Sequence, residues 1–350
     1  MTKSVYWRDI QDSKGNWEGM EVTVEAPSFR RPPLHLLTGH NGRMKLMLND
    51  LPLFWATSEW GYDGAWVIRN GVTKDMNLAL IPPIRSADVE RYAPLTPVER
   101  IKAWSRYFVS RVSESSSTFM SPGSWLAQGM LPDAIKSRGD AEPGPAAWQF
   151  SSGKNDYFQY PESSLSGDEI VEGTQPQSIK WLDPGNLISL HEVDPLSARL
   201  KWWRKKAREG ISPPILLWNI SGLLSYLVVD GHYRLRAAMD ENIQPTFVII
   251  SNMAAQEFCY SPEHQQHRVE RLLIQRARNP GFTTDTFNKL LIDTFDDRPH
   301  LYASTYSWAD IKSELEWVRE VSQQLEVSGY LELLPKIIEY REWDVPRAAH

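Results

Sequence analysis

Cysteine is the residue that this sequence has least of. Cys259 is the single cysteine among 350 residues, which excludes an intramolecular disulfide framework and a zinc site built from several cysteines. No stretch approaches the roughly 20 apolar residues that a membrane-spanning helix needs. The first residues also lack the apolar core of a secretory signal peptide. We therefore expect a cytoplasmic protein without a membrane segment.

An excess of positive charge is also missing. The chain has 38 Lys and Arg against 44 Asp and Glu, and the region after residue 252 is acidic. Proteins that bind DNA usually present a basic surface, so we do not expect nucleic acid as a partner. The zinc-protease, Walker and nucleophile-elbow motifs are absent from the sequence. One basic cluster could guide an anionic nucleotide, although a solvated helix face is the commoner interpretation. Its members are Arg199, Lys201, Arg204, Lys205, Lys206 and Arg208.

The most informative segment is 227–238, Leu-Val-Val-Asp-Gly-His-Tyr-Arg-Leu-Arg-Ala-Ala. An apolar, β-branched run ends in a polar turn, and a helix-forming segment follows. The first backbone N–H groups of a helix have no partner within the helix and attract anions. Asp230, His232 and Arg234 stand at this turn, which predicts an anion site there. A satisfied surface pair of His232 and Arg234 is the alternative interpretation.

The neighbouring segments predict a compact unit around this turn. Residues 213–218 and 227–230 are expected to form a hairpin through Asn219, Ser221 and Gly222, and 243–250 a further strand. Upstream, 196–209 is expected to be a helix that ends at Gly210. The polar loop Leu190-His-Glu-Val-Asp-Pro195 precedes that helix.

This arrangement resembles the ParB/sulfiredoxin fold over residues 178–252. Within that superfamily, Asp230-Gly-His-Tyr-Arg234 and the upstream His191-Glu192 are most similar to the free-serine kinase branch, whose motif is Asp-Gly-His-His-Arg. Tyr233 departs from the motif, where the family usually has a second His. Sulfiredoxins carry a catalytic Cys in the turn and chromosome-partitioning ParB proteins carry Gly-Glu-Arg-Arg. This chain has neither.

The resemblance implies a kinase that transfers a phosphoryl group from ATP or ADP to the hydroxyl of a free amino acid, such as serine, or of a related metabolite. Glu192 matches the family's general base, with Asp230 and His232 as further catalytic candidates. Gly231, His232, Tyr233 and Arg234 would bind the phosphates, and Asp230 could hold Mg²⁺. Two alternatives stay open: a regulatory module that binds CTP or ATP, and a ParB-like nuclease, which the acidic C-terminal region disfavours.

For the whole chain we expect an α+β protein in three regions. Residues 1–177 form a mixed region rich in Trp and Pro, 178–252 the ParB/sulfiredoxin-like nucleotide-binding domain, and 253–350 a helical region. The tryptophans Trp55, Trp60, Trp66 and Trp104 suggest a ligand cage, but packing is the commoner role. The oligomeric state is left open. Expected strands are 20–25 and 64–69, expected helices are 95–112, 263–278, 282–295, 307–327 and 330–340, and 163–177 is an expected linker.

Overall fold

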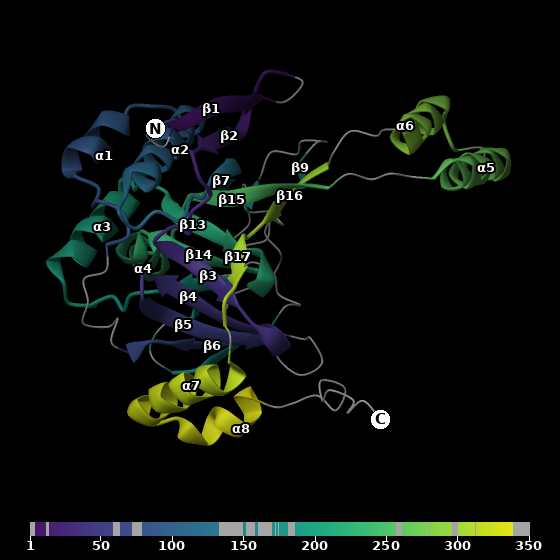
Figure 1. Ribbon diagram of the computed structural model, residues 1–350. Helices are drawn as coiled ribbons and strands as arrows, with labels where there is room; N and C mark the ends of the chain where they lie inside the picture. The colour runs from purple at the N-terminus through teal and green to yellow at the C-terminus, as the bar shows by residue number, and fades with distance from the viewer. Residues whose placement is uncertain are drawn as a thin grey trace, which may run out of the picture. The chain divides into compact units, whose positions relative to one another are not determined.

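The protein is a mixed α/β chain in two compact units (Figure 1). One unit comprises 1–155, 160–253 and 303–350, and the other 156–159 and 254–302. The mixture of sheets and helices agrees with the expected α+β class. The computed structural model describes residues 4–11, 14–58, 64–71, 79–132, 150–151, 158–159, 170–171, 173, 175–180, 186–256, 261–279, 281–295, 300–311 and 313–338.

The larger sheet contains strands from the expected N-terminal region, 1–177, and from the expected central domain, 178–252. β7 pairs with β15 so that Ala127 faces Ile250, which makes the predicted hairpin continuous with the N-terminal strands. That hairpin is confirmed, since β13 and β14 are antiparallel and joined by a 3-10 turn at Ser221–Leu223. β8 (Phe150–Ser151) pairs with β7. In spatial order the strands are β1 (Ser4–Gln11), β2 (Trp17–Glu25), β7 (Gly123–Pro132), β15 (Phe247–Gln256), β13 (Ile215–Ile220), β14 (Ser225–Asp230), β12 (Asn186–Ser189) and β10 (Ile170–Val171).

The smaller sheet is built mainly from the first region and includes the predicted strand at 64–69. Its last strand comes from the far end of the chain, because β17 pairs in parallel with β3. The strand that begins at Gln177 also belongs to this sheet, where it pairs with the strand at 64–69. The segment expected to be a linker, 163–177, therefore ends in a strand. The order is β11 (Gln177–Lys180), β6 (Gly64–Arg69), β5 (Leu51–Ser58), β4 (Arg43–Leu48), β3 (Leu34–Thr38) and β17 (Ser307–Ala309).

Both faces of the larger sheet are buried, so β13 and β14 are apolar at almost every position. Leu216 and Trp218 point into the main core, which they share with the smaller sheet. Ile215 and Leu217 point the other way, into a second core. This alternation follows from the two-residue period of a strand. A continuous apolar run is therefore the expected pattern for such a strand.

Four helices of this unit surround the turn that follows β14. α2 (Pro97–Glu114) begins with a capping box between Thr96 and Glu99, confirming the predicted N-terminus, and it packs on β7 and β2. α3 (Ala198–Arg208) packs against α4 (His232–Asp240). α1 (Ser86–Tyr92) joins them through a shared core that includes Val89, Leu200 and Ala237.

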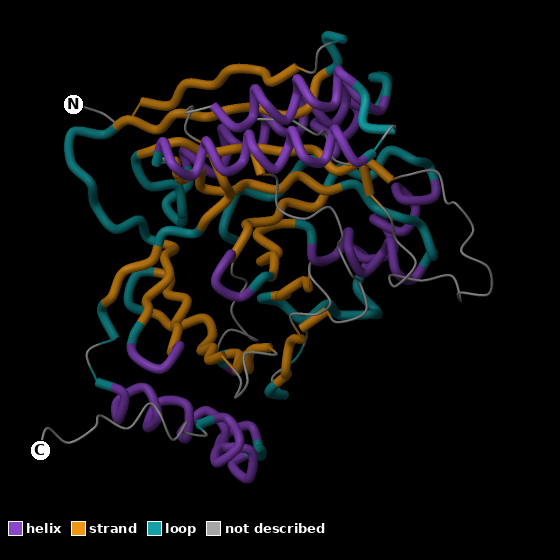
Figure 2. Tube along the Cα trace, turned by 90° about the vertical axis from the view of Figure 1, so that its right-hand side faces the viewer, coloured by secondary structure: helices purple, strands orange, loops and turns teal. Residues whose placement is uncertain are grey.

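The expected helix at 307–327 is wrong in its first third, residues 307–313. Ser307–Ala309 is β17, and the helix α7 runs from Glu314 to Ser328 with Ser313 as its N-cap. The apolar stripe after residue 314 does form a helix face, and Trp317 packs on Trp55 and Trp66 of the smaller sheet. Figures 1 and 2 both show α7 beside that sheet. The expected helix at 330–340 is shorter, a 3-10 turn at Leu331–Leu333 and α8 at Leu334–Ile337, and residues 339–340 lie outside the described chain.

The second unit contains two of the predicted helices. α5 (Pro262–Arg278) and α6 (Thr284–Phe295) pack against each other, and β9 (Phe158–Gln159) pairs in parallel with β16 (His300–Ser304). Since β16 and β17 are strands, the description of 253–350 as helical is incomplete. No helix among the described residues is long and apolar enough to cross a membrane.

The tryptophans serve packing where the structure describes them. Trp55 and Trp66 lie in the core beneath α7, and Trp104 lies in the main core. Packing, the commoner role, is therefore the role of these three tryptophans. Trp60 lies outside the described residues, as does Cys259.

Candidate functional site

The turn after β14 and the loop after β12 lie side by side because their strands are parallel neighbours. Ser189 pairs with Val228, so both strands end at the same edge of the sheet. The backbone N–H of Leu190 donates a hydrogen bond to Nε2 of His232 at 3.2 Å. The rings of His191 and His232 meet edge to face, with centroids 4.4 Å apart. The structure thus brings together the two segments that the sequence singled out.

Gly231 begins helix α4 in a conformation that favours glycine. Its φ of 109° and ψ of 17° lie in the left-handed region, where a Cβ is strained. A Cβ added here would also come within 2.8 Å of Nη2 of Arg234. Glycine at this position therefore lets the guanidinium lie directly against the backbone of the turn.

Arg234 is buried beneath the turn, with only 3 % of the residue exposed. Its Nη2 donates to the carbonyl of Pro214 at 2.9 Å and to Oδ2 of Asp230 at 2.8 Å. The guanidinium also lies over the ring of Trp203, with its Cζ 5.2 Å from the centroid. Its Nε is buried and has no hydrogen-bond partner among the described residues. A buried donor without a partner costs free energy, which a bound anion would recover.

His232 is an uncharged acceptor at this site. Burial lowers the pKa of its ring well below 6.5, and electrostatic interactions with His191 and with the positive charges of Arg69 and Arg234 lower it further. Nε2 accepts the hydrogen bond from Leu190, so the proton of the neutral ring is on Nδ1. The expectation that His232 donates to a phosphate can therefore apply only to Nδ1.

Asp230 and Tyr233 make contacts within the fold. Oδ2 of Asp230 accepts from Arg234, which leaves Oδ1 as the oxygen that could coordinate a cation. The ring of Tyr233 lies under the guanidinium of Arg199, 5.0 Å from Cζ to centroid, and packs on the core of α3. Tyr233 is thus held at α3, whereas the sequence predicted a phosphate contact.

Glu192 is half-buried in the loop beside the turn. Its Oε1 lies 3.9 Å from the position that a Cβ on Gly173 would occupy. The loop that carries it is held at its start by two hydrogen bonds of Leu190, one to His232 and one from Arg69. The base of the loop is therefore ordered by the same residues that form the turn.

The described residues contain no group of three or more His, Cys, Asp or Glu that could hold a metal ion. Asp230 can contribute one free carboxylate oxygen, and Mg²⁺ bound to a nucleotide commonly takes only one or two protein carboxylates. The donor set therefore fits a cation that arrives with the phosphates and does not fit a closed protein site.

Arg69 was missed by reasoning from the sequence. It ends β6, is 2 % exposed, and its Nη2 donates to the carbonyl of Leu190 at 2.9 Å. The signal in the sequence was weak, because it consisted only of a charged residue at the end of an apolar strand. Four of the six cations in the basic cluster pair with carboxylates, Arg204 and Arg208 with Glu241 and Lys205 and Lys206 with Glu209. This supports the interpretation of the cluster as a solvated helix face.

No protein-family model, curated protein or solved structure matched this chain.

Proposed function

We propose that the turn from Asp230 to Arg234 binds the phosphates of ATP or ADP. The observation that carries this proposal is the buried Nε of Arg234, a charged donor without a partner beside the N-terminus of α4. The amides of the first helical turn add donors that have no partner within the helix. An arginine fork and a helix N-terminus are both suited to phosphate oxygens.

We further propose that the chain is a small-molecule kinase of the ParB/sulfiredoxin type, with a free amino acid such as serine or a related metabolite as its acceptor. The order of elements from β12 to β15 supports the fold resemblance: strand, loop, helix, hairpin, turn, helix and strand. A cytoplasmic location is consistent with the single cysteine.

In this mechanism Glu192 is the general base. Its carboxylate takes the proton of the acceptor hydroxyl while that oxygen attacks the terminal phosphorus, and the bond from phosphorus to the leaving nucleotide oxygen breaks. Arg234 and the amides of α4 hold the phosphate oxygens. His232, neutral and fixed by Leu190, positions the loop that carries Glu192. Mg²⁺ held with the help of Asp230 would neutralise phosphate charge.

A nucleotide-binding regulator is the second candidate. Two contacts favour it: Asp230 accepts a hydrogen bond from Arg234, and the ring of Tyr233 lies under Arg199. Because these two side chains are held within the fold, Glu192 is left as the main candidate for a catalytic residue. Such a module would bind CTP or ATP without transferring a phosphoryl group.

Phosphorus NMR separates the two candidates. Wild-type protein, ATP or ADP, Mg²⁺ and a pool of free amino acids should give a new phosphomonoester signal. Glu192→Gln should lower its rate about 100-fold or more while nucleotide binding persists. Glu209→Gln, the same change at the exposed C-cap of α3, should leave the rate unchanged. Nucleotide binding without transfer in the wild type would establish the regulator, and equal rates in the wild type and Glu192→Gln would remove Glu192 as the base.

A further inference from the structure

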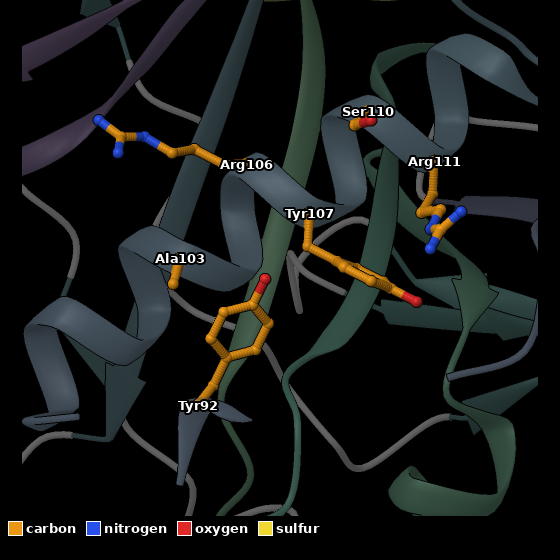
Figure 3. A pocket seen from close by; sticks show the side chains of 6 residues that line it. All are labelled: Tyr92, Ala103, Arg106, Tyr107, Ser110 and Arg111. Carbon is orange, nitrogen blue, oxygen red and sulfur yellow. The ribbon is translucent and has the colours of Figure 1, made fainter. Parts of the chain in front are cut away.

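A hollow of about 480 Å³ lies between α1 and α2, outside the segment that resembles a known family (Figure 3). Tyr92 of α1 points its hydroxyl toward α2, and Arg111 and the ring of Tyr107 extend toward the same side of that helix. The lining residues are Tyr92, Ala103, Arg106, Tyr107, Ser110 and Arg111.

Arg111 differs from the other cations of α2. Lys102 and Arg106 both pair with Asp9, and Arg106 extends away from the two tyrosines in Figure 3. Arg100 donates to three backbone carbonyls. Arg111 is half-buried over the ring of Tyr107, with its Cζ 5.0 Å from the centroid, and forms no ion pair with a described residue. Its charge is therefore available to a ligand.

The hydroxyl of Tyr107 is a second donor in the hollow. Burial raises its pKa, the carboxylates of Asp88 and Asp230 raise it further, and Arg111 opposes them. The hydroxyl therefore keeps its proton at neutral pH.

We propose that this hollow binds the carboxylate of a small molecule, with Arg111 as the cation and the Tyr107 hydroxyl as a second hydrogen-bond donor. A carboxylate carries one negative charge, which matches Arg111, the lining arginine that forms no ion pair with a described residue. A doubly charged phosphate would be repelled more strongly by Asp88 and Asp230. The identity of the bound molecule rests on the proposed function, in which it is the acceptor.

Binding measurements by ligand-observed NMR test the proposal without relying on turnover. The probes are L-serine, L-threonine and glycolate, each against its carboxamide, together with inorganic phosphate. The carboxylates should bind the wild type at least about tenfold more tightly than their amides or phosphate. Arg111→Gln should weaken carboxylate binding about tenfold or more, and Arg111→Lys less, since it keeps the charge but loses the planar fork. Lys102→Gln is the matched control, because that cation pairs with Asp9.

Three results would overturn the proposal: no carboxylate binds, amides or phosphate bind as well as carboxylates, or Arg111→Gln and Lys102→Gln have equal effects. Circular dichroism confirms the fold of each variant, and Arg111→Lys provides the test if Arg111→Gln does not fold. Repeating the series with ATP separates this proposal from the kinase. Carboxylate binding through Arg111 without ATP binding or turnover would support the hollow and refute the kinase.

Discussion

Two buried arginines, one in a strand and one in a helix, have similar surroundings. Arg43 begins β4 and Arg234 lies in α4; each is 3 % exposed, pairs with a carboxylate and lies over a tryptophan ring. All three guanidinium nitrogens of Arg43 have partners, on Glu314, Thr57 and two carbonyls. Arg234 donates only from Nη2, and its buried Nε has no partner among the described residues.

The difference separates an arginine whose donors are all used within the fold from one that keeps a donor without a partner among the described residues. Arg43 joins α7 and α8 to the smaller sheet, since Glu314 and the carbonyls of Ile337 and Ile338 all accept from it. The protein leaves no donor of that side chain for a ligand. Arg234 lies where a strand, a left-handed glycine and a helix N-terminus meet, and it keeps donor capacity there. Burial and pairing alone would not have distinguished the two residues.

Replacing the arginines should give the largest contrast. Arg43→Ala breaks a buried, fully bonded pair and should lower the free energy of unfolding by about 3–5 kcal/mol. Arg234→Ala also breaks a buried pair, with Asp230, but it removes two hydrogen bonds where Arg43→Ala removes five, so it should cost less, about 2–3 kcal/mol. Urea unfolding measures both, with the half-exposed pair of Arg31 and Asp310 as a control, where Arg31→Ala should cost less than about 1 kcal/mol. A larger loss for Arg234→Ala than for Arg43→Ala would reverse the comparison.

Gly231→Ala should disturb the turn itself. The left-handed backbone and the 2.8 Å approach to Arg234 predict a loss of about 2 kcal/mol in stability, together with loss of ATP binding. Gly210→Ala is the matched control, because Gly210 also has a positive φ, of 68°, but its Cβ would meet nothing within 4 Å. That variant should cost about 1 kcal/mol and bind ATP normally. Equal ATP affinities in the two variants would argue against the turn as the binding site.

The stability of the protein should fall as the pH drops below about 6.5. His232 takes up its proton near pH 6.5 in the unfolded chain but only at lower pH in the folded chain. Acid therefore favours the unfolded state, by up to about 1.4 kcal/mol per pH unit between the two pKa values. His232→Gln keeps an acceptor for Leu190 and should flatten this dependence in urea unfolding, whereas exposed His40→Gln should not. An unchanged slope in His232→Gln would mean that His232 is not the group responsible.

Tyr233→Phe should have the smallest effect. The ring keeps its place under Arg199 and only the hydroxyl is lost, so stability should change by less than about 0.5 kcal/mol. ATP affinity should also change little, because the ring packs at α3. A large loss of affinity on calorimetric titration would restore Tyr233 as a phosphate contact.

Local parts of the site were predictable from the sequence. The β-branched run before Asp230 requires a strand, Gly231 permits the left-handed turn, and the following Leu and Ala residues favour a helix. The proximity of the 190–192 loop was implied by the family resemblance and follows in the structure from the parallel pairing of β12 with β14. Whether Glu192 is a base stays a prediction.

Contacts between distant segments could not be predicted in the same way. Arg69 reaches Leu190 across 121 positions of sequence, and no local pattern marks that contact. The error at 307–313 has a similar cause. Trp308 continues an apolar periodicity that suits a helix, but tertiary pairing with Leu37 of β3 makes it a strand. Pairing with the edge strand of a sheet therefore determined the structure of this segment, and its helical periodicity did not.

Phosphate binding at the turn is tested most directly by an NMR titration of backbone amides with ATP and Mg²⁺. We expect saturable shifts that are largest at the N–H groups of His232, Tyr233 and Arg234, in the first turn of α4, and an unchanged Nε–H signal of Arg43. Shifts confined to another part of the chain, or no saturable shift at any amide, would contradict the claim that this turn binds phosphate.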